Sequence, residues 1–115
     1  MNCRFNNNNT PINIDLLATN CFSISFYSSN IEYNTGSMNI SGTCAFYGSY
    51  FEGNTGLSVT LPRTALFSGT CFINENNLIK TPIALGKKTF VSCWNNNSTN
   101  IYDNDANVEK LGCNF

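Results

Sequence analysis

The sequence has no histidine and few charged residues. Six Lys and Arg against seven Asp and Glu give a net charge of −1, and charged residues make up 11% of the chain. Without histidine the usual general base is missing, which excludes Cys–His and Ser–His nucleophilic mechanisms. The carboxylates are scattered rather than paired, which disfavours glycoside hydrolysis. The sequence therefore predicts a protein that is not an enzyme and has no catalytic residues.

Long apolar runs, basic stripes and closely spaced cysteines are also lacking. No run approaches the roughly 18 apolar residues of a membrane-spanning helix. No two cysteines are closer than 18 residues, so the Cys-x-x-Cys spacing of zinc and redox sites is absent. Binding to nucleic acid would need a stripe of Lys and Arg that neutralises its phosphates, and the six Lys and Arg of this sequence form no such stripe. We expect no metal, no cofactor, no nucleic-acid partner and no membrane span.

Polar uncharged residues and apolar residues dominate instead. The chain holds 21 Asn, 11 Ser and 11 Thr, while 42% of residues are hydrophobic and 13% aromatic. The apolar content is too high for a chain that stays unfolded. A nearly neutral surface of amides and hydroxyls repels other copies weakly and so tolerates self-association.

Apolar residues alternate with polar ones at the period of a β-strand. The pattern is clearest over 22–26 and 57–61, and weaker candidates are 12–16, 38–41, 43–47, 65–67, 70–73, 79–83, 89–94 and 100–102. Only 103–111 has room for a helical turn. Short, evenly spaced strands separated by Asn-Thr-Gly turns favour an all-β jelly roll or β-sandwich over residues 12–115, preceded by an N-terminal connector arm at 1–11.

A short right-handed β-solenoid is the alternative fold. Glu32-Tyr33-Asn34-Thr35-Gly36 recurs as Glu52-Gly53-Asn54-Thr55-Gly56, and Ser-Gly-Thr-Cys ends at both Cys44 and Cys71. Each coil of a solenoid would then carry one rung of a cysteine ladder. Successive cysteines are 18, 23, 27, 22 and 20 residues apart, however, and this uneven spacing favours the sandwich.

The six cysteines are the side chains best suited to covalent chemistry, because pairs of thiols can form disulfides. Three internal disulfides are one reading, with fifteen possible pairings. The other reading separates Cys3 and Cys113, near the two ends, as candidates for bonds between copies. The remaining four lie in predicted strands as paired or buried thiols: Cys21, Cys44, Cys71 and Cys93. Head-to-tail bonding that does not close would give a durable fibre.

The plan of the chain resembles that of the endospore appendage pilins. The matching features are Met1-Asn2-Cys3 with a polar arm through Asn9, a cysteine at the first predicted strand (Cys21) and one near the end (Cys113). The phrases GTCAFYGS and GLSVTLPRTALF are similar to jelly-roll strands of that group. The resemblance implies small jelly-roll subunits whose connector cysteines bond to neighbouring subunits. This chain differs in having a single cysteine in the arm.

Location follows from the cysteines and the first residues. MNCRFNNNN lacks the basic and apolar regions of a secretory signal. A removed signal, another secretion route or release by lysis would each reconcile this with a cysteine content typical of oxidising compartments. We expect a self-assembling structural subunit of an extracellular filament, appendage or coat, located outside the cell or at a cell or spore surface.

A secreted, disulfide-stapled, lectin-like module is the alternative function. Exposed aromatic side chains stack on sugars, and neighbouring amides bind their hydroxyl groups. Trp94, Asn96 and Tyr102 are the candidate glycan contacts. A packed position for Trp94 at the edge of the core is the competing interpretation.

Overall fold

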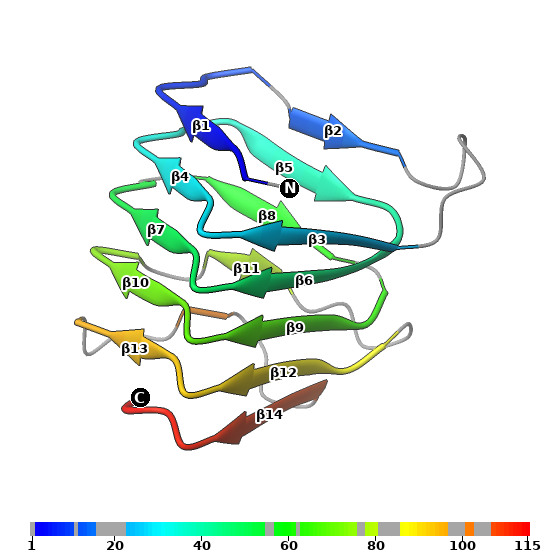
Figure 1. Cartoon of the computed structure of the whole chain (residues 1–115). Helices are drawn as coiled ribbons and strands as arrows, with labels where there is room; N and C mark the ends of the chain where they lie inside the picture. Colours follow the sequence, from blue (N-terminus) through cyan, green and yellow to red (C-terminus); the bar gives the residue numbers. More distant parts are fainter. Residues whose placement is uncertain are drawn as a thin grey trace.

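The computed structural model describes residues 2–10, 12–15, 23–54, 57–61, 63–75, 78–80, 86–96, 101–102 and 107–115. These residues form fourteen short strands and no helix (Figure 1). In chain order the strands are β1 (Arg4–Asn6), β2 (Ile12–Ile14), β3 (Ser23–Tyr27), β4 (Asn30–Glu32), β5 (Ser37–Ile40), β6 (Thr43–Tyr47), β7 (Tyr50–Glu52), β8 (Ser58–Thr60), β9 (Ala65–Ser68), β10 (Cys71–Ile73), β11 (Ile79–Lys80), β12 (Lys88–Val91), β13 (Trp94–Asn95) and β14 (Val108–Leu111).

The strands stack as a β-solenoid with three sheets. Sheet A has the order β1-β4-β7-β10-β13, sheet B the order β11-β8-β5-β2, and sheet C the order β14-β12-β9-β6-β3. The chain visits the three sheets in turn, so that β1, β2 and β3 form the first coil and β4, β5 and β6 the next (Figure 1). Near the C-terminal end, Tyr102 continues sheet B as a single bridge to Ile79.

The all-β prediction is confirmed, and the stacked arrangement is the solenoid that the sequence offered as an alternative. The jelly roll or sandwich that we favoured is not observed. Jelly-roll neighbours are antiparallel, whereas every strand pair between described residues here is parallel.

The predicted connector arm contains part of the first coil. Strand β1 lies within 1–11 and pairs with β4 in the register Arg4↔Asn30. Just after it, Asn7 N donates to Glu32 O at 3.1 Å. Residues 4–6 therefore belong to the solenoid and are not a separate arm.

The core consists of side chains stacked in columns. In sheet C, Phe26, Phe46, Phe67 and Phe90 are fully buried and stack in succession, with ring centroids 4.7, 5.1 and 4.8 Å apart. These intervals are close to the 4.7–4.9 Å between neighbouring strands, because residues in register on parallel strands lie directly above one another. Sheet A adds its own column, in which Phe51 and Phe72 stack at 5.2 Å.

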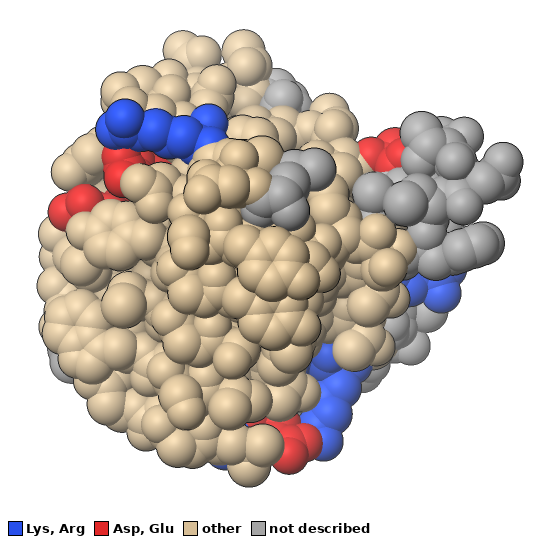
Figure 2. Space-filling view, viewed as in Figure 1, with Lys and Arg blue, Asp and Glu red and all other residues tan. Residues whose placement is uncertain are grey.

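Charged side chains gather at the margins of the face on which β6 and β9 lie. Figure 2 shows this face as a broad uncharged area with Lys, Arg, Asp and Glu near its edges. Two ion pairs lie among the described residues: Arg4 with Glu32 at 3.0 Å, and Lys87 with Glu109. This face is weakly charged, as the composition predicts.

Candidate functional site

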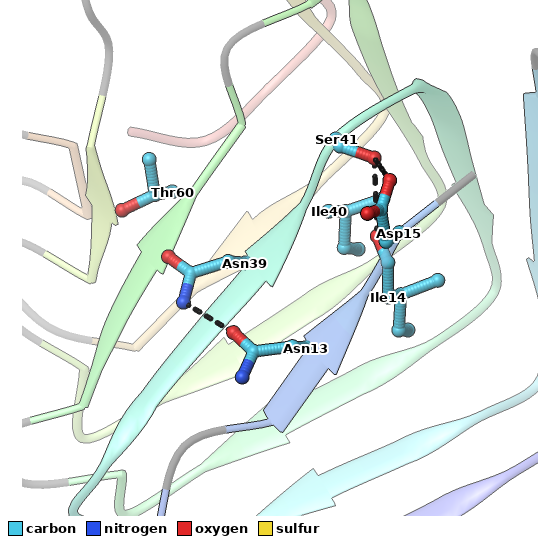
Figure 3. A pocket seen from close by; sticks show the side chains of 7 residues that line it. All are labelled: Asn13, Ile14, Asp15, Asn39, Ile40, Ser41 and Thr60. Carbon is cyan, nitrogen blue, oxygen red and sulfur yellow. Dashed lines mark hydrogen bonds between the residues drawn. The ribbon is translucent and has the colours of Figure 1, made fainter. Parts of the chain in front are cut away.

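A depression at strands β2, β5 and β8 of sheet B is lined by polar, apolar and acidic side chains (Figure 3): Asn13, Ile14, Asp15, Asn39, Ile40, Ser41 and Thr60. Its volume is about 310 Å³. Asn39 Nδ2 donates to Asn13 Oδ1 at 2.9 Å, and Ser41 Oγ donates to Asp15 Oδ1 at 3.0 Å. These polar side chains bond to each other across neighbouring coils. They tie β2 and the residue after it to β5 and the residue after it.

The three candidate glycan contacts do not form one platform. Trp94 is 44% exposed on sheet A, whereas Tyr102 is 2% exposed and packs in the core against Phe90. Asn96 is exposed, and its Oδ1 accepts a hydrogen bond from Asn74 N at 2.9 Å. Because Tyr102 is buried, it cannot stack on a sugar beside Trp94.

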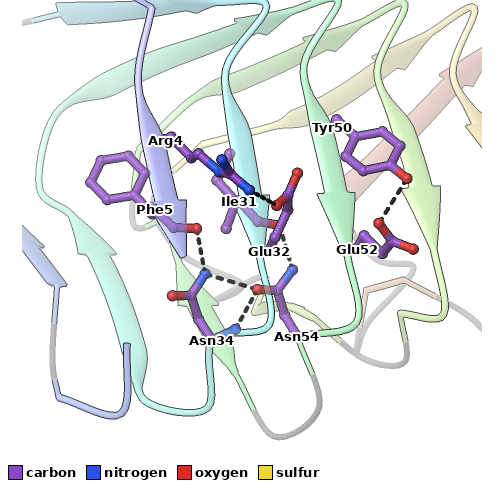
Figure 4. A network of polar contacts seen from close by, with 8 residues as sticks. All are labelled: Arg4, Phe5, Ile31, Glu32, Asn34, Tyr50, Glu52 and Asn54. Atoms are coloured by element: carbon purple, nitrogen blue, oxygen red, sulfur yellow. Dashed lines mark hydrogen bonds and ion pairs between the residues drawn. The ribbon is translucent and has the colours of Figure 1, made fainter. Parts of the chain in front are cut away.

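A ladder of side-chain amides lies at the corner between sheets A and B, and Figure 4 shows its two buried members, Asn34 and Asn54. Asn8 Nδ2 donates to Asn34 Oδ1 at 2.9 Å, and Asn34 Nδ2 donates to Asn54 Oδ1 at 3.0 Å. Asn54 Nδ2 donates in turn to Glu75 Oε1 at 2.5 Å. The repeated Glu-x-Asn phrase supplies two of these rungs, since Glu32 pairs in register with Glu52.

Ionisation of Glu75 opposes folding. Burial raises the pKa of Glu75 from 4.5 to about 7, although the hydrogen bonds from Asn54 act in the other direction. Between these two pH values the folded chain keeps a proton that the unfolded chain has lost. Stability therefore falls as pH rises through this window, by up to about 1.4 kcal/mol per pH unit, and levels off above the folded pKa.

We expect Glu75→Gln to be more stable than the natural chain above pH 7, with no advantage near pH 4.5. Glutamine still accepts the hydrogen bonds of Asn54 but cannot ionise. Thermal unfolding of both proteins between pH 4.5 and 8 checks this, with Glu109→Gln at the partly exposed pair with Lys87 as the control. A stability difference that does not change with pH would contradict the assignment.

A second corner, between sheets C and A, carries a column of small polar side chains. We call it the corner column, and its members occupy equivalent positions on successive coils because the strands beside them are in register. The members are Cys3, Ser29, Ser49, Thr70, Cys93 and Cys113. The residue before each of the last five has positive φ, as at Gly48 and Gly112, which turns the chain from one sheet to the next.

Thiols and hydroxyls make the same hydrogen bonds in the corner column. Thr70 Oγ1 donates to the carbonyl of Phe46 at 3.2 Å, and Cys93 Sγ donates to that of Phe67 at 3.1 Å. Cys113 Sγ donates to the carbonyl of Phe90 at 3.3 Å. Each side chain thus reaches the preceding coil. The sequence argument required one cysteine in every coil and therefore a constant cysteine spacing. In the structure the column is continuous although the spacing is uneven, because Ser29, Ser49 and Thr70 occupy the coils between the cysteines.

The two terminal members of the corner column are Cys3 and Cys113, both half-buried. At one end, the backbone N–H of Cys3 donates to Ser29 Oγ at 2.9 Å. At the other end, Asn114 N donates to Cys93 O at 3.3 Å and so continues sheet A past Cys113. The termini lie at different levels of the stack (Figure 1). The outermost coils therefore each present a thiol at the same corner.

The other cysteines have separate environments. Cys44 is buried in sheet C, where burial raises the pKa of its thiol to about 12 despite the nearby Lys88. Cys71 is half-buried on β10, beside Tyr50 and Trp94 in register. The repeated Ser-Gly-Thr-Cys phrase is thus not a structural repeat, because its two cysteines lie in different sheets. Cys21 lies outside the described residues.

The N-terminal end of the solenoid presents apolar side chains. Phe5, Ile12, Ile14 and Ile24 are only half-buried, although they occupy the same columns as fully buried residues of the next coil. Among the described residues, strands β1, β2 and β3 each have a neighbour on one side only. As far as residues 2–10, 12–15 and 23–27 show, this end offers open strand edges and part of the core.

The C-terminal end is covered differently. Lys110 stands in register with Phe90 but is exposed, and its ammonium lies 5.5 Å from the ring centre of Phe115 and 5.7 Å from that of Tyr102. The Phe115 ring packs edge-on against Phe90 at 5.6 Å. A charge at a position that faces inward on the neighbouring coil is one way to blunt a sheet edge, so Lys110 weakens further strand pairing at this end.

The described residues contain no group of three side chains suited to hold a metal ion, and no helix long and apolar enough to cross a membrane. Comparisons with protein-family models, with characterised proteins and with solved structures find no match.

Proposed function

We propose that this chain is a structural subunit that assembles head to tail and is cross-linked by a disulfide between Cys113 of one copy and Cys3 of the next. The observation that carries the proposal is that both thiols belong to the corner column, at its two ends. If a second solenoid continued the stack, its Cys3 would follow Cys113 at one strand spacing. That spacing of 4.7–4.9 Å lies within the Cα–Cα range of disulfides.

The unlike ends support a heterologous contact. The first coil offers apolar side chains such as Phe5 and Ile24, and the last coil offers the ring of Phe115. A contact between two different surfaces need not close on itself and then yields a filament. Lys110 weakens unassisted stacking, so the covalent bond carries much of the junction. Disulfides persist in oxidising surroundings, which suits an appendage or coat outside the cell or on a spore.

The assembly is expected to depend on reductant and on Cys3. Oxidised protein should run on a denaturing gel as a series of multiples of 12.7 kDa that collapses to the single chain with reductant. Cys3→Ser should remove most of the series and shorten particles seen by electron microscopy. Cys71→Ser is the matched control, because its half-buried thiol lies outside the corner column. A single band with and without reductant would overturn the proposal.

A further inference from the structure

The strongest unassigned feature is the pair of thiols at the C-terminal end of the corner column. Cys93 and Cys113 are in register on adjacent coils. Each donates to a carbonyl of the coil before it, at Phe67 and Phe90. Cys113 is also close enough to be among the groups that raise the pKa of the Cys93 thiol. Two cysteines at facing positions on neighbouring parallel strands lie within the Cα–Cα range that a disulfide spans.

We propose that Cys93 and Cys113 form a disulfide within one chain, and that this bond competes with the junction to Cys3 of the next copy. The competition, but not the bond itself, rests on the proposed function. Cys113 has one sulfur and can hold only one partner. A chain with the internal bond closes its last coil and has no thiol at that end for another copy.

The chemistry balances with a disulfide oxidant such as glutathione disulfide. The two S–H bonds of Cys93 and Cys113 break and one S–S bond forms between them. The two electrons and two protons pass to the oxidant, which is cleaved into two glutathione thiols. The same oxidant converts Cys113 and a neighbouring copy's Cys3 into the intersubunit bond, so the two products differ only in which thiol reaches Cys113 first.

The environment of Cys93 bears on the durability of the internal bond. Burial raises the pKa of the Cys93 thiol to about 11. A thiol of high pKa is a poor leaving group in exchange, so an incoming thiolate displaces Cys93 from Cys113 slowly. The oxidation conditions before assembly, rather than later exchange, then decide the share of chains that can polymerise.

Trypsin separates the relevant cysteines onto different peptides. Cleavage after Arg4, Lys88 and Lys110 places Cys3 on residues 1–4, Cys93 on 89–110 and Cys113 on 111–115. Cys71 falls on residues 64–80. Dilute full-length protein is oxidised with glutathione disulfide, alkylated and digested without reductant. We expect 89–110 linked to 111–115, in an amount independent of protein concentration. Both peptides alkylated at every concentration, or Cys93 bound elsewhere, would overturn the internal bond.

Cys93→Ser tests the competition. Serine fits this position, since the corner column already holds serine at Ser29 and Ser49, and circular dichroism confirms the fold. The variant should raise the yield of the 1–4 to 111–115 link about twofold or more, because Cys113 loses its internal partner. Cys71→Ser should leave that yield unchanged. An unchanged yield in Cys93→Ser would overturn the competition.

The failures of the two proposals give different peptides. An internal bond without any multimers would leave the Cys93–Cys113 assignment standing and would remove the proposed function. Multimers linked through residues 1–4 and 111–115, with no internal bond at any dilution, would support the proposed function and would remove the Cys93–Cys113 assignment.

Discussion

Replacing Phe67 by alanine should lower the free energy of unfolding by about 3–5 kcal/mol, the cost of deleting a fully buried aromatic ring. Phe67 lies at the centre of the aromatic columns and stacks between Phe46 and Phe90 at 5.1 and 4.8 Å. Its ring also lies against Phe51 and Phe72 of sheet A. Each coil of a solenoid contacts only its neighbours. A cavity at Phe67 therefore weakens the contacts that join the coils on one side of it to the coils on the other. Urea unfolding followed by circular dichroism measures the loss.

The matched control is Tyr27→Ala. The Tyr27 ring stacks on Tyr47 at 5.1 Å, a geometry like that of the core pairs, but it is 54% exposed on the outer face of sheet C. Its removal leaves no closed cavity and should cost about 1 kcal/mol, the value of an aromatic pair. Equal losses for Phe67→Ala and Tyr27→Ala would show that the columns do not form the core described above.

Replacing Asn54 by alanine should cost about 3–4 kcal/mol, because several buried polar groups lose their partners together. Asn54 Oδ1 accepts from both the N–H and the side-chain amide of Asn34 at 3.0 Å. Its Nδ2 donates to Ile31 O at 2.8 Å and to Glu75. The hydrogen bonds from Asn54 lower the pKa of Glu75. The variant should therefore also lose more stability in total as pH rises, because the window of loss extends to higher pH.

Asn39→Ala is the control for the amide ladder. Asn39 also sits in a row of asparagines, but it is only half-buried and its Nδ2 makes an exposed hydrogen bond to Asn13. Water replaces that partner at little cost, so we expect a loss below about 0.5 kcal/mol. The measurement is the same urea titration. A loss at Asn54 no larger than that at Asn39 would contradict a structural role for the buried ladder.

The position of many strands could be predicted from alternation, but their partners could not. The pattern over 43–47 predicted β6 exactly where it lies, and 57–61 contains β8. Alternation reports which side chains are buried. It does not report whether the neighbouring strand runs parallel, and here that choice separates a solenoid from a sandwich. Residues 108–111 form β14 although Val-Glu-Lys-Leu has little strand character, because pairing with β12 overrides local preference.

The candidate site was partly visible in the sequence. Cys3 and Cys113 were selected for their nearness to the ends, and the structure adds that they share one corner. The signal for that column is weak, since three consecutive rungs, Ser29, Ser49 and Thr70, are hydroxyl residues and not cysteines. Coil length also varies: residues in register such as Phe5, Ile31, Phe51 and Phe72 are 26, 20 and 21 residues apart. Tyr102 was misplaced because aromatic residues suit both core and surface.

The head-to-tail junction is tested most directly by mixing two variants that each lack one end. Cys3→Ser keeps Cys113, and Cys113→Ser keeps Cys3, so neither can extend a chain of identical copies. Cys71→Ser and Cys93→Ser in both backgrounds remove the half-buried thiol on β10 and the proposed internal partner of Cys113. After oxidation, each variant alone should remain a single chain on a denaturing gel, while the mixture should form a covalent dimer and stop there. Covalent dimers from either variant alone, or none from the mixture, would contradict the junction between Cys3 and Cys113.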